Sequence, residues 1–131
     1  MTKRLSSPTL RVDPGRELPF EYAGRSLTGL AGDTLASAMF AGGVRVFSRG
    51  IKYHRPRGLY SLDGESSNCL VEVDRLANVR AETTLLRAGV SVRPQNVFGS
   101  PERDYYGVLG LFDRLMPAGF YYRHFHKPYR L

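Results

Sequence analysis

Residues 18–43 read LPFEYAGRSLTGLAGDTLASAMFAGG, and this stretch predicts two paired strands followed by a helix. The apolar residues Leu18, Phe20 and Tyr22 alternate with other residues, which is the period of a strand that buries one face. The Ala-Gly pair that follows predicts a tight turn, and residues 25–28 then return as the partner strand. The fold is therefore expected to begin with a β-hairpin.

A short helix is predicted directly after this hairpin. Either Asp33 or Thr34 can cap its first turn, because both side chains can accept a backbone N–H bond. The residues that fall on one face at helical spacing are Leu35, Ala38, Met39 and Gly42. The Gly42-Gly43 pair is expected to end the helix, since glycine tolerates the left-handed backbone of a C-terminal cap.

The rest of the chain predicts more strands with long connections. Short strands are expected at 44–46, 69–73, 79–81 and 90–92, and a helix at 104–115 that stops before Pro117. Residues 48–68 are rich in glycine and charge, and a loop of this length is usually functional or docked on another surface. This order of elements indicates an α+β fold of the β-grasp type, a small mixed sheet over one helix. We divide the chain into an N-terminal arm (1–16), a β-grasp domain (17–100) and a C-terminal helix with a docking tail (101–131).

Composition narrows the classes of function. The chain has 131 residues, a net charge of +7 and one cysteine, Cys69, so an internal disulfide is excluded and a reducing, cytoplasmic location is expected. There is neither a secretory leader pattern nor an apolar run that approaches a membrane span. The positive charge is spread along the chain, which argues against nucleic acid as the partner. The carboxylates form no pair that indicates catalysis, so we expect no catalytic residue in this chain.

Two segments are candidate contact surfaces. The basic loop at 49–58 contains Lys52, His54, Arg55 and Arg57, a set that suits an anionic group on a partner. We favour docking on a partner subunit for this loop, with direct contact to a cofactor or a solvated loop without a specific role as the alternatives.

The aromatic and basic tail is the second candidate surface. Its residues Phe120, Tyr121 and Tyr122 are expected to pack on a neighbouring chain, with stacking on nucleic-acid bases as the minor alternative. His124 and His126 lie two positions apart, but no third metal ligand is near them in the sequence. A structural or interface role is therefore favoured over a metal site for both histidines.

Several motifs in the right order resemble one family. They are LAGDTLASAM at 30–39, GVRV at 43–46, KYHRPRG at 52–58, NCLV at 68–71, NVRA at 78–81 and LMPAGFYY at 115–122. Together they resemble the N-terminal domain of the alpha subunit of heterotetrameric sarcosine oxidase. They are also similar to the small iron–sulfur subunits of related amino-acid, opine and hydroxyproline dehydrogenases. The resemblance implies a plant-type [2Fe–2S] ferredoxin-like fold, with flavin (FAD or FMN) bound by larger partner subunits and NAD as a further candidate cofactor there.

The resemblance also indicates where a cluster would be held. A plant-type cluster takes four thiolates spaced C-x4-C-x2-C with a distant fourth. In this chain the corresponding positions are Ser61, Ser66, Cys69 and Glu82, so one thiolate of four is present. Serine and glutamate oxygens are poor substitutes for thiolate at iron. From this count we predict that the chain holds no cluster and no other cofactor, and that Cys69 is a buried strand residue.

The function predicted from the sequence is a non-catalytic, cluster-free subunit of a flavin-dependent, sarcosine oxidase-like amine or amino-acid oxidoreductase. Two alternatives remain open. One is a [2Fe–2S] electron-transfer subunit of such a dehydrogenase. The other is a free-standing basic binding module.

Overall fold

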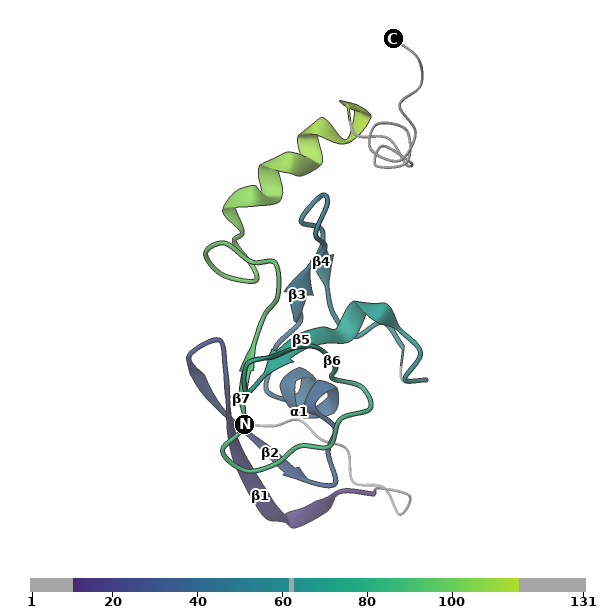
Figure 1. Cartoon of the computed structure of the whole chain (residues 1–131). Helices are drawn as coiled ribbons and strands as arrows, with labels where there is room; N and C mark the ends of the chain where they lie inside the picture. The colour runs from purple at the N-terminus through teal and green to yellow at the C-terminus, as the bar shows by residue number, and fades with distance from the viewer. Residues whose placement is uncertain (1–10, 62, 116–131) are drawn as a thin grey trace.

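A computed structural model describes residues 11–61 and 63–115. Its main element is a sheet of five strands in the order β2-β1-β7-β5-β6, which confirms the α+β, ferredoxin-like fold. The five strands are β1 (Asp13–Tyr22), β2 (Arg25–Ala31), β5 (Leu70–Val73), β6 (Leu76–Arg80) and β7 (Ser91–Arg93). The neighbours pair antiparallel, except that β1 and β7 are parallel. Figure 1 shows α1 (Leu35–Ala41) packed inside the curve of this sheet.

The first hairpin forms as its turn chemistry predicts. Ala23 and Gly24 both have positive φ, 50° and 76°, which is the backbone of a two-residue hairpin turn. The strand β1 starts at Asp13, inside the segment predicted as an arm, because Asp13 pairs with Ala31 across an irregularity in the register. The hairpin is thus longer than its apolar alternation indicates.

Thr34 is the N-cap of α1. Its side chain accepts from the backbone N–H of Ser37, and the Ser37 hydroxyl accepts from the Thr34 N–H, which is a reciprocal capping box. Asp33 has a different role: it is buried and accepts from the Leu30 N–H at 2.8 Å and from the Ser37 hydroxyl at 2.8 Å. Leu35, Ala38 and Met39 are completely buried against the sheet, as their spacing predicts.

Two predictions for the middle of the chain are wrong. Residues 44–46 form no strand, because the Val44 N–H bonds to the Met39 carbonyl and the segment completes the end of α1 instead. The predicted long loop contains a second hairpin, in which β3 (Ser48–Arg49) pairs with β4 (Pro56–Arg57). A short 3-10 turn, η1 (Ser67–Cys69), then leads into β5.

The core lies between α1 and the sheet and includes Phe20, Phe47, Val71 and Val92. The hydroxyl of Tyr22 lies 2.9 Å from the Val46 carbonyl and 3.0 Å from the Phe47 carbonyl, so it ties the segment after α1 to β1. Burial, with a smaller contribution from Glu102 and an opposing one from Arg25, raises the pKa of the Tyr22 hydroxyl well above its usual range.

The predicted C-terminal helix is a 3-10 helix, η2 (Tyr105–Leu115), with irregular backbone at Phe112. The β3–β4 hairpin, drawn in blue, and η2, drawn in yellow-green, both extend beyond the same end of the sheet (Figure 1). Many large apolar side chains on η2 are exposed, which shows that this element buries little of its own surface. No helix in the described part of the chain is long and apolar enough to cross a membrane.

Candidate functional site: the hairpin network and the cluster positions

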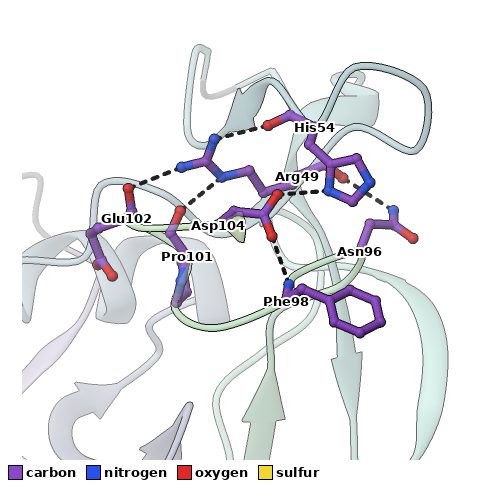
Figure 2. A network of polar contacts seen from close by, with 7 residues as sticks. All are labelled: Arg49, His54, Asn96, Phe98, Pro101, Glu102 and Asp104. Atoms are coloured by element: carbon purple, nitrogen blue, oxygen red, sulfur yellow. Dashed lines mark hydrogen bonds and ion pairs between the residues drawn. The ribbon is translucent and has the colours of Figure 1, made fainter. Parts of the chain in front are cut away.

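Arg49 joins the β3–β4 hairpin to the segment before η2. Its guanidinium donates to three backbone carbonyls, those of His54 at 2.8 Å, Pro101 at 2.9 Å and Glu102 at 3.0 Å (Figure 2). The Asn96 side chain in turn donates to the Arg49 carbonyl at 3.1 Å. The Arg49 guanidinium bonds to carbonyls on two segments. It therefore fixes the position of the β3–β4 hairpin relative to the segment before η2.

His54 and Asp104 form the second part of the network. The Nδ1 atom of His54 lies 2.7 Å from Oδ2 of Asp104, and the Asp104 side chain is fully buried. The other oxygen, Oδ1, accepts from the Phe98 N–H at 2.7 Å, as Figure 2 shows. Burial alone would raise the pKa of Asp104. The bonds from Phe98 and His54, with the charges of His54 and Arg49, outweigh burial and hold this pKa below its ordinary value.

The network explains the backbone of the basic loop. His54 has φ of 50°, a left-handed conformation that a histidine adopts rarely. Its ring is held by Asp104 and by the ring of Tyr106, whose centroid lies 5.2 Å away.

Among the predicted contact residues, His54 is therefore buried and internally bonded, while Lys52, Arg55 and Arg57 are carried on the surface of the hairpin. The interface roles of these residues stay predictions, and Phe120, Tyr121, Tyr122, His124 and His126 lie outside the described residues.

The four predicted cluster positions separate into two kinds. Cys69 is buried, as predicted, and its thiol donates to the Gly58 carbonyl at 3.2 Å. Burial raises the pKa of this thiol to about 12, and the adjacent Glu82 carboxylate adds to the rise. Ser61 and Ser66 are bonded within surface turns: Ser61 donates to Asp63, and Ser66 accepts from the backbone and side-chain N–H groups of Asn68.

Glu82 is the unusual group of this set. Both of its carboxylate oxygens are buried, and neither has a hydrogen-bond partner within the described residues. The neighbouring Cys69 thiol, whose pKa Glu82 raises, lies 3.2 Å from the Gly58 carbonyl, to which it donates. A buried polar group without a partner costs about 1–3 kcal/mol. Glu82 therefore opposes folding in the chain as described.

Replacing Glu82 by an apolar residue of similar size should stabilise the chain. We expect Glu82→Met to raise the free energy of unfolding by about 1 kcal/mol, measured by urea denaturation at pH 7. Glu72→Met is the control, because Glu72 lines an open surface pocket and its substitution should change stability by less than about 0.5 kcal/mol. A destabilised Glu82→Met variant would show that the carboxylate has a partner that stabilises it.

The sequence patterns did not identify Arg49 and Asp104 as parts of one site. Arg49 lies at the start of the basic loop, and Asp104 lies at the start of the predicted C-terminal helix. Their partners lie about fifty positions away, at separations of 50 residues for His54–Asp104 and 52 for Arg49–Pro101. No periodicity in a single sequence reports such a pairing.

The fold, with its parallel pairing of the first and last strands, defines the class as ferredoxin-like. Residues 15–97 match the family model of the 2Fe-2S iron-sulfur cluster binding domain, which is well over half of the chain. The chain belongs to this family.

Curated relatives are alpha subunits of sarcosine oxidase. The protein from Rhizobium meliloti (strain 1021) is 40% identical over 121 residues, which is 89% of this chain and 12% of the relative. The protein from Corynebacterium sp. (strain P-1) is 41% identical over 68 residues, 52% of this chain and 7% of the relative. This chain thus spans only a small part of the proteins it matches, and the resemblance to the sarcosine oxidase alpha subunit is confirmed.

A solved structure supports the fold. The crystal structure of L-proline dehydrogenase from P. horikoshii superposes with a TM-score of 0.55 over 63% of this chain and 16% of that chain, at 17% sequence identity. A likeness at this identity shows the fold alone.

The prediction that this chain is cluster-free and holds no cofactor is contradicted by the family match. It rested on a count of thiolates, and the match over residues 15–97 is to a domain that binds a 2Fe-2S cluster. The iron–sulfur alternative is the better supported one. The number of thiolates at four positions decided that prediction. The match over the whole domain instead assigns the chain to a cluster-binding family.

The side chains at the four positions do not make the ligand set of a plant-type cluster. Cys69 and Glu82 lie together and are buried, but Ser61 and Ser66 are bonded in surface turns. Within residues 11–61 and 63–115, no three His, Cys, Asp or Glu side chains are grouped so that they could hold a metal ion. The side chains at these four positions therefore do not fit four-thiolate ligation.

Proposed function

We propose that this chain is the ferredoxin-type electron-transfer module of an amine- or amino-acid-oxidising complex related to sarcosine oxidase. The observation that carries the proposal is the 40% identity to a sarcosine oxidase alpha subunit over 89% of the chain. The family match favours the electron-transfer role over that of a free-standing binding module. A reducing, cytoplasmic location is part of the proposal and rests on the single cysteine.

The partners we propose are larger subunits that bind flavin and a dinucleotide. The matched relative from Rhizobium meliloti is roughly eight times as long as the part of it that this chain covers, since that part is 12% of the relative, which supports a larger assembly around a domain of this kind. Substrate oxidation would take place on the larger subunits.

The proposed docking surface is the exposed apolar part of η2 together with the tip of the β3–β4 hairpin. Tyr105 and Leu111 on η2 are 81% and 80% exposed, and Ile51 on the hairpin is 78% exposed. Both elements extend from the same end of the sheet (Figure 1). Clustered exposed apolar side chains mark interaction sites on proteins of this size. We include Lys52, Arg55 and Arg57 as its charged rim, with His54 holding the hairpin backbone beneath them.

Copurification from the native host tests the proposal. The tagged chain, purified anaerobically, should retain a larger subunit with flavin absorbance, and the iron and acid-labile sulfide content of that complex tests the electron-transfer role. A flavin-containing complex without iron would contradict the electron-transfer role, but it would still support the proposed assembly with a larger subunit. A chain that retains no larger subunit would contradict the assembly.

Matched variants locate the docking surface in the same experiment. Tyr105→Glu with Leu111→Glu should remove most of the larger subunit from the purified sample, because two charges would enter the apolar contact. Leu76→Glu with Leu85→Glu is the control, since these side chains are also largely exposed, 68% and 63%, but lie on and beside the sheet. Equal losses for the two pairs would contradict docking through η2.

A further inference from the structure

The five-stranded sheet has two edges, and they differ in regularity. One edge is β6, where Asn78 has φ of 60° and the pairing with β5 shifts register between Val71 and Val73. A bulged edge of this kind does not present a regular row of bonding groups to another strand. The other edge is β2, which pairs with β1 without interruption from Arg25 to Leu30. β2 is therefore the regular edge of this sheet.

The hairpin register determines which backbone groups of β2 point outward. Tyr22 and Arg25 flank the two-residue turn, so they exchange hydrogen bonds with each other, and every second pair along the ladder does the same. Ser26 and Thr28 lie at the alternate positions, and both are exposed. The backbone N–H and C=O groups of these two residues, the outward pair, therefore point away from β1.

The hydrogen bonds around the hairpin agree with this alternation. The Glu21 N–H donates to the Val90 carbonyl at 3.0 Å, so the β1 residue opposite the first member of the outward pair bonds away from β2. Near the end of β2, the Leu30 N–H donates to Oδ2 of Asp33 at 2.8 Å, and the Leu30 carbonyl accepts from the Asp33 N–H at 3.0 Å. Asp33 thus closes the last outward position. Within residues 11–61 and 63–115, the backbone groups of the outward pair have no such partner.

A second copy of β2 fits this edge when it runs antiparallel and the contact is centred on Leu27. Ser26 of one copy then lies opposite Thr28 of the other, and each such pair exchanges both backbone bonds. Their hydroxyl side chains also face each other across the strands, which is a favourable pairing. Arg25 lies opposite Gly29, so no two like charges are directly opposed. Because one register satisfies every unpaired group, the edge is complementary to itself.

We propose that two copies of this chain associate through their β2 strands, so that the two sheets become one continuous sheet across a two-fold axis. β2 lies at the end of the molecule opposite η2 and the β3–β4 hairpin (Figure 1), so this contact leaves the proposed docking surface accessible. The inference goes beyond the proposed function, which concerns a larger subunit and not a second copy. A contact along one strand buries less than the roughly 1,200 Å² of stable interfaces, so the dimer should be reversible.

Analytical ultracentrifugation of the whole chain tests the proposal. The measurement covers about 5–500 µM protein, since a reversible dimer depends on concentration, and uses about 0.2 M salt to screen the net charge of +7. We expect the average mass to rise from 14.7 kDa toward twice that value as the concentration increases. A mass that stays at 14.7 kDa over the whole range would overturn the proposal. Growth beyond the dimer would also overturn it, because a two-fold contact is closed.

Variants of the outward pair locate the contact. Thr28→Pro removes one outward N–H and leaves the bonds to β1 in place, and Ser26→Lys with Thr28→Lys puts like charges opposite each other in the dimer. Each should raise the dissociation constant of the dimer at least about tenfold. Leu76→Lys with Ala77→Lys is the control, because it adds the same charge on β6 and should leave the constant within about twofold.

Circular dichroism checks that each variant is folded, and the lysine pair on β2 decides the question if the proline variant does not fold. Dimerisation that is unchanged in the β2 lysine pair would overturn the proposal, because the chains would then associate through another surface. An equal loss in the β6 control pair would overturn it as well, since the effect would then follow net charge.

Discussion

Gly58→Ala should lower the free energy of unfolding by about 3 kcal/mol, the largest effect that we expect from a single methyl group in this chain. An added Cβ at Gly58 would lie 2.2 Å from the carbonyl oxygen of Arg45. That oxygen is backbone, so no side-chain rotation can relieve the overlap. The measurement is chemical denaturation of the variant and the parent chain at pH 7.

The surroundings of Gly58 prevent an easy backbone shift. The Phe47 N–H donates to the Arg57 carbonyl at 2.7 Å, and the Cys69 thiol donates to the Gly58 carbonyl at 3.2 Å. A displacement of Gly58 would therefore break bonds on two sides. Gly107→Ala is the control, because the nearest atom to its added Cβ is 3.9 Å away, and its stability should change by less than about 1 kcal/mol. Equal losses for both glycines would contradict the close approach.

Asp104→Ala should lower the free energy of unfolding by about 2 kcal/mol and loosen the β3–β4 hairpin. The substitution leaves the buried His54 ring without its 2.7 Å partner, and an unsatisfied buried polar group costs about 1–3 kcal/mol. It also removes the acceptor of the solvent-exposed Phe98 N–H bond. Denaturation measures the loss, and hydrogen exchange at residues 50–57 should become faster. Glu102→Gln is the control, because Glu102 offers its carbonyl rather than its side chain to Arg49.

The contribution of Asp104 should also depend on pH in a defined direction. Its pKa is lowered from the ordinary value of 3.8 in the folded chain, so the unfolded chain takes up the proton first as the pH falls. The stabilisation is complete above the unfolded value and is lost as the pH falls through the folded value. The stability difference between the parent chain and Asp104→Asn should therefore shrink below about pH 4. A difference that stays constant down to pH 2 would contradict the pairing.

The local elements were predictable because their causes are local. The turn at Ala23-Gly24, the cap at Thr34 and the buried face of α1 each depend on residues within a few positions of one another. The order of these elements was enough to predict the β-grasp fold, and the motifs placed the chain beside the sarcosine oxidase alpha subunit. The count of thiolates, in contrast, led to a wrong conclusion on the cofactor, because ligand positions describe one site and not the family of the whole domain.

The sequence by itself therefore determined the hairpin, the helix with its cap, the family resemblance and the buried position of Cys69. Only the tertiary structure decided that β1 lies parallel to β7, that His54 bonds to Asp104, and that Arg49 joins two segments about fifty residues apart. The physical reason is the separation along the chain of the residues that interact. Capping, turn formation and apolar periodicity are set by neighbours along the chain, whereas these contacts join residues far apart in the sequence that meet through the closure of the sheet over α1. The same closure places the carboxylate of Glu82 beside Cys69 without a hydrogen-bond partner in the described structure.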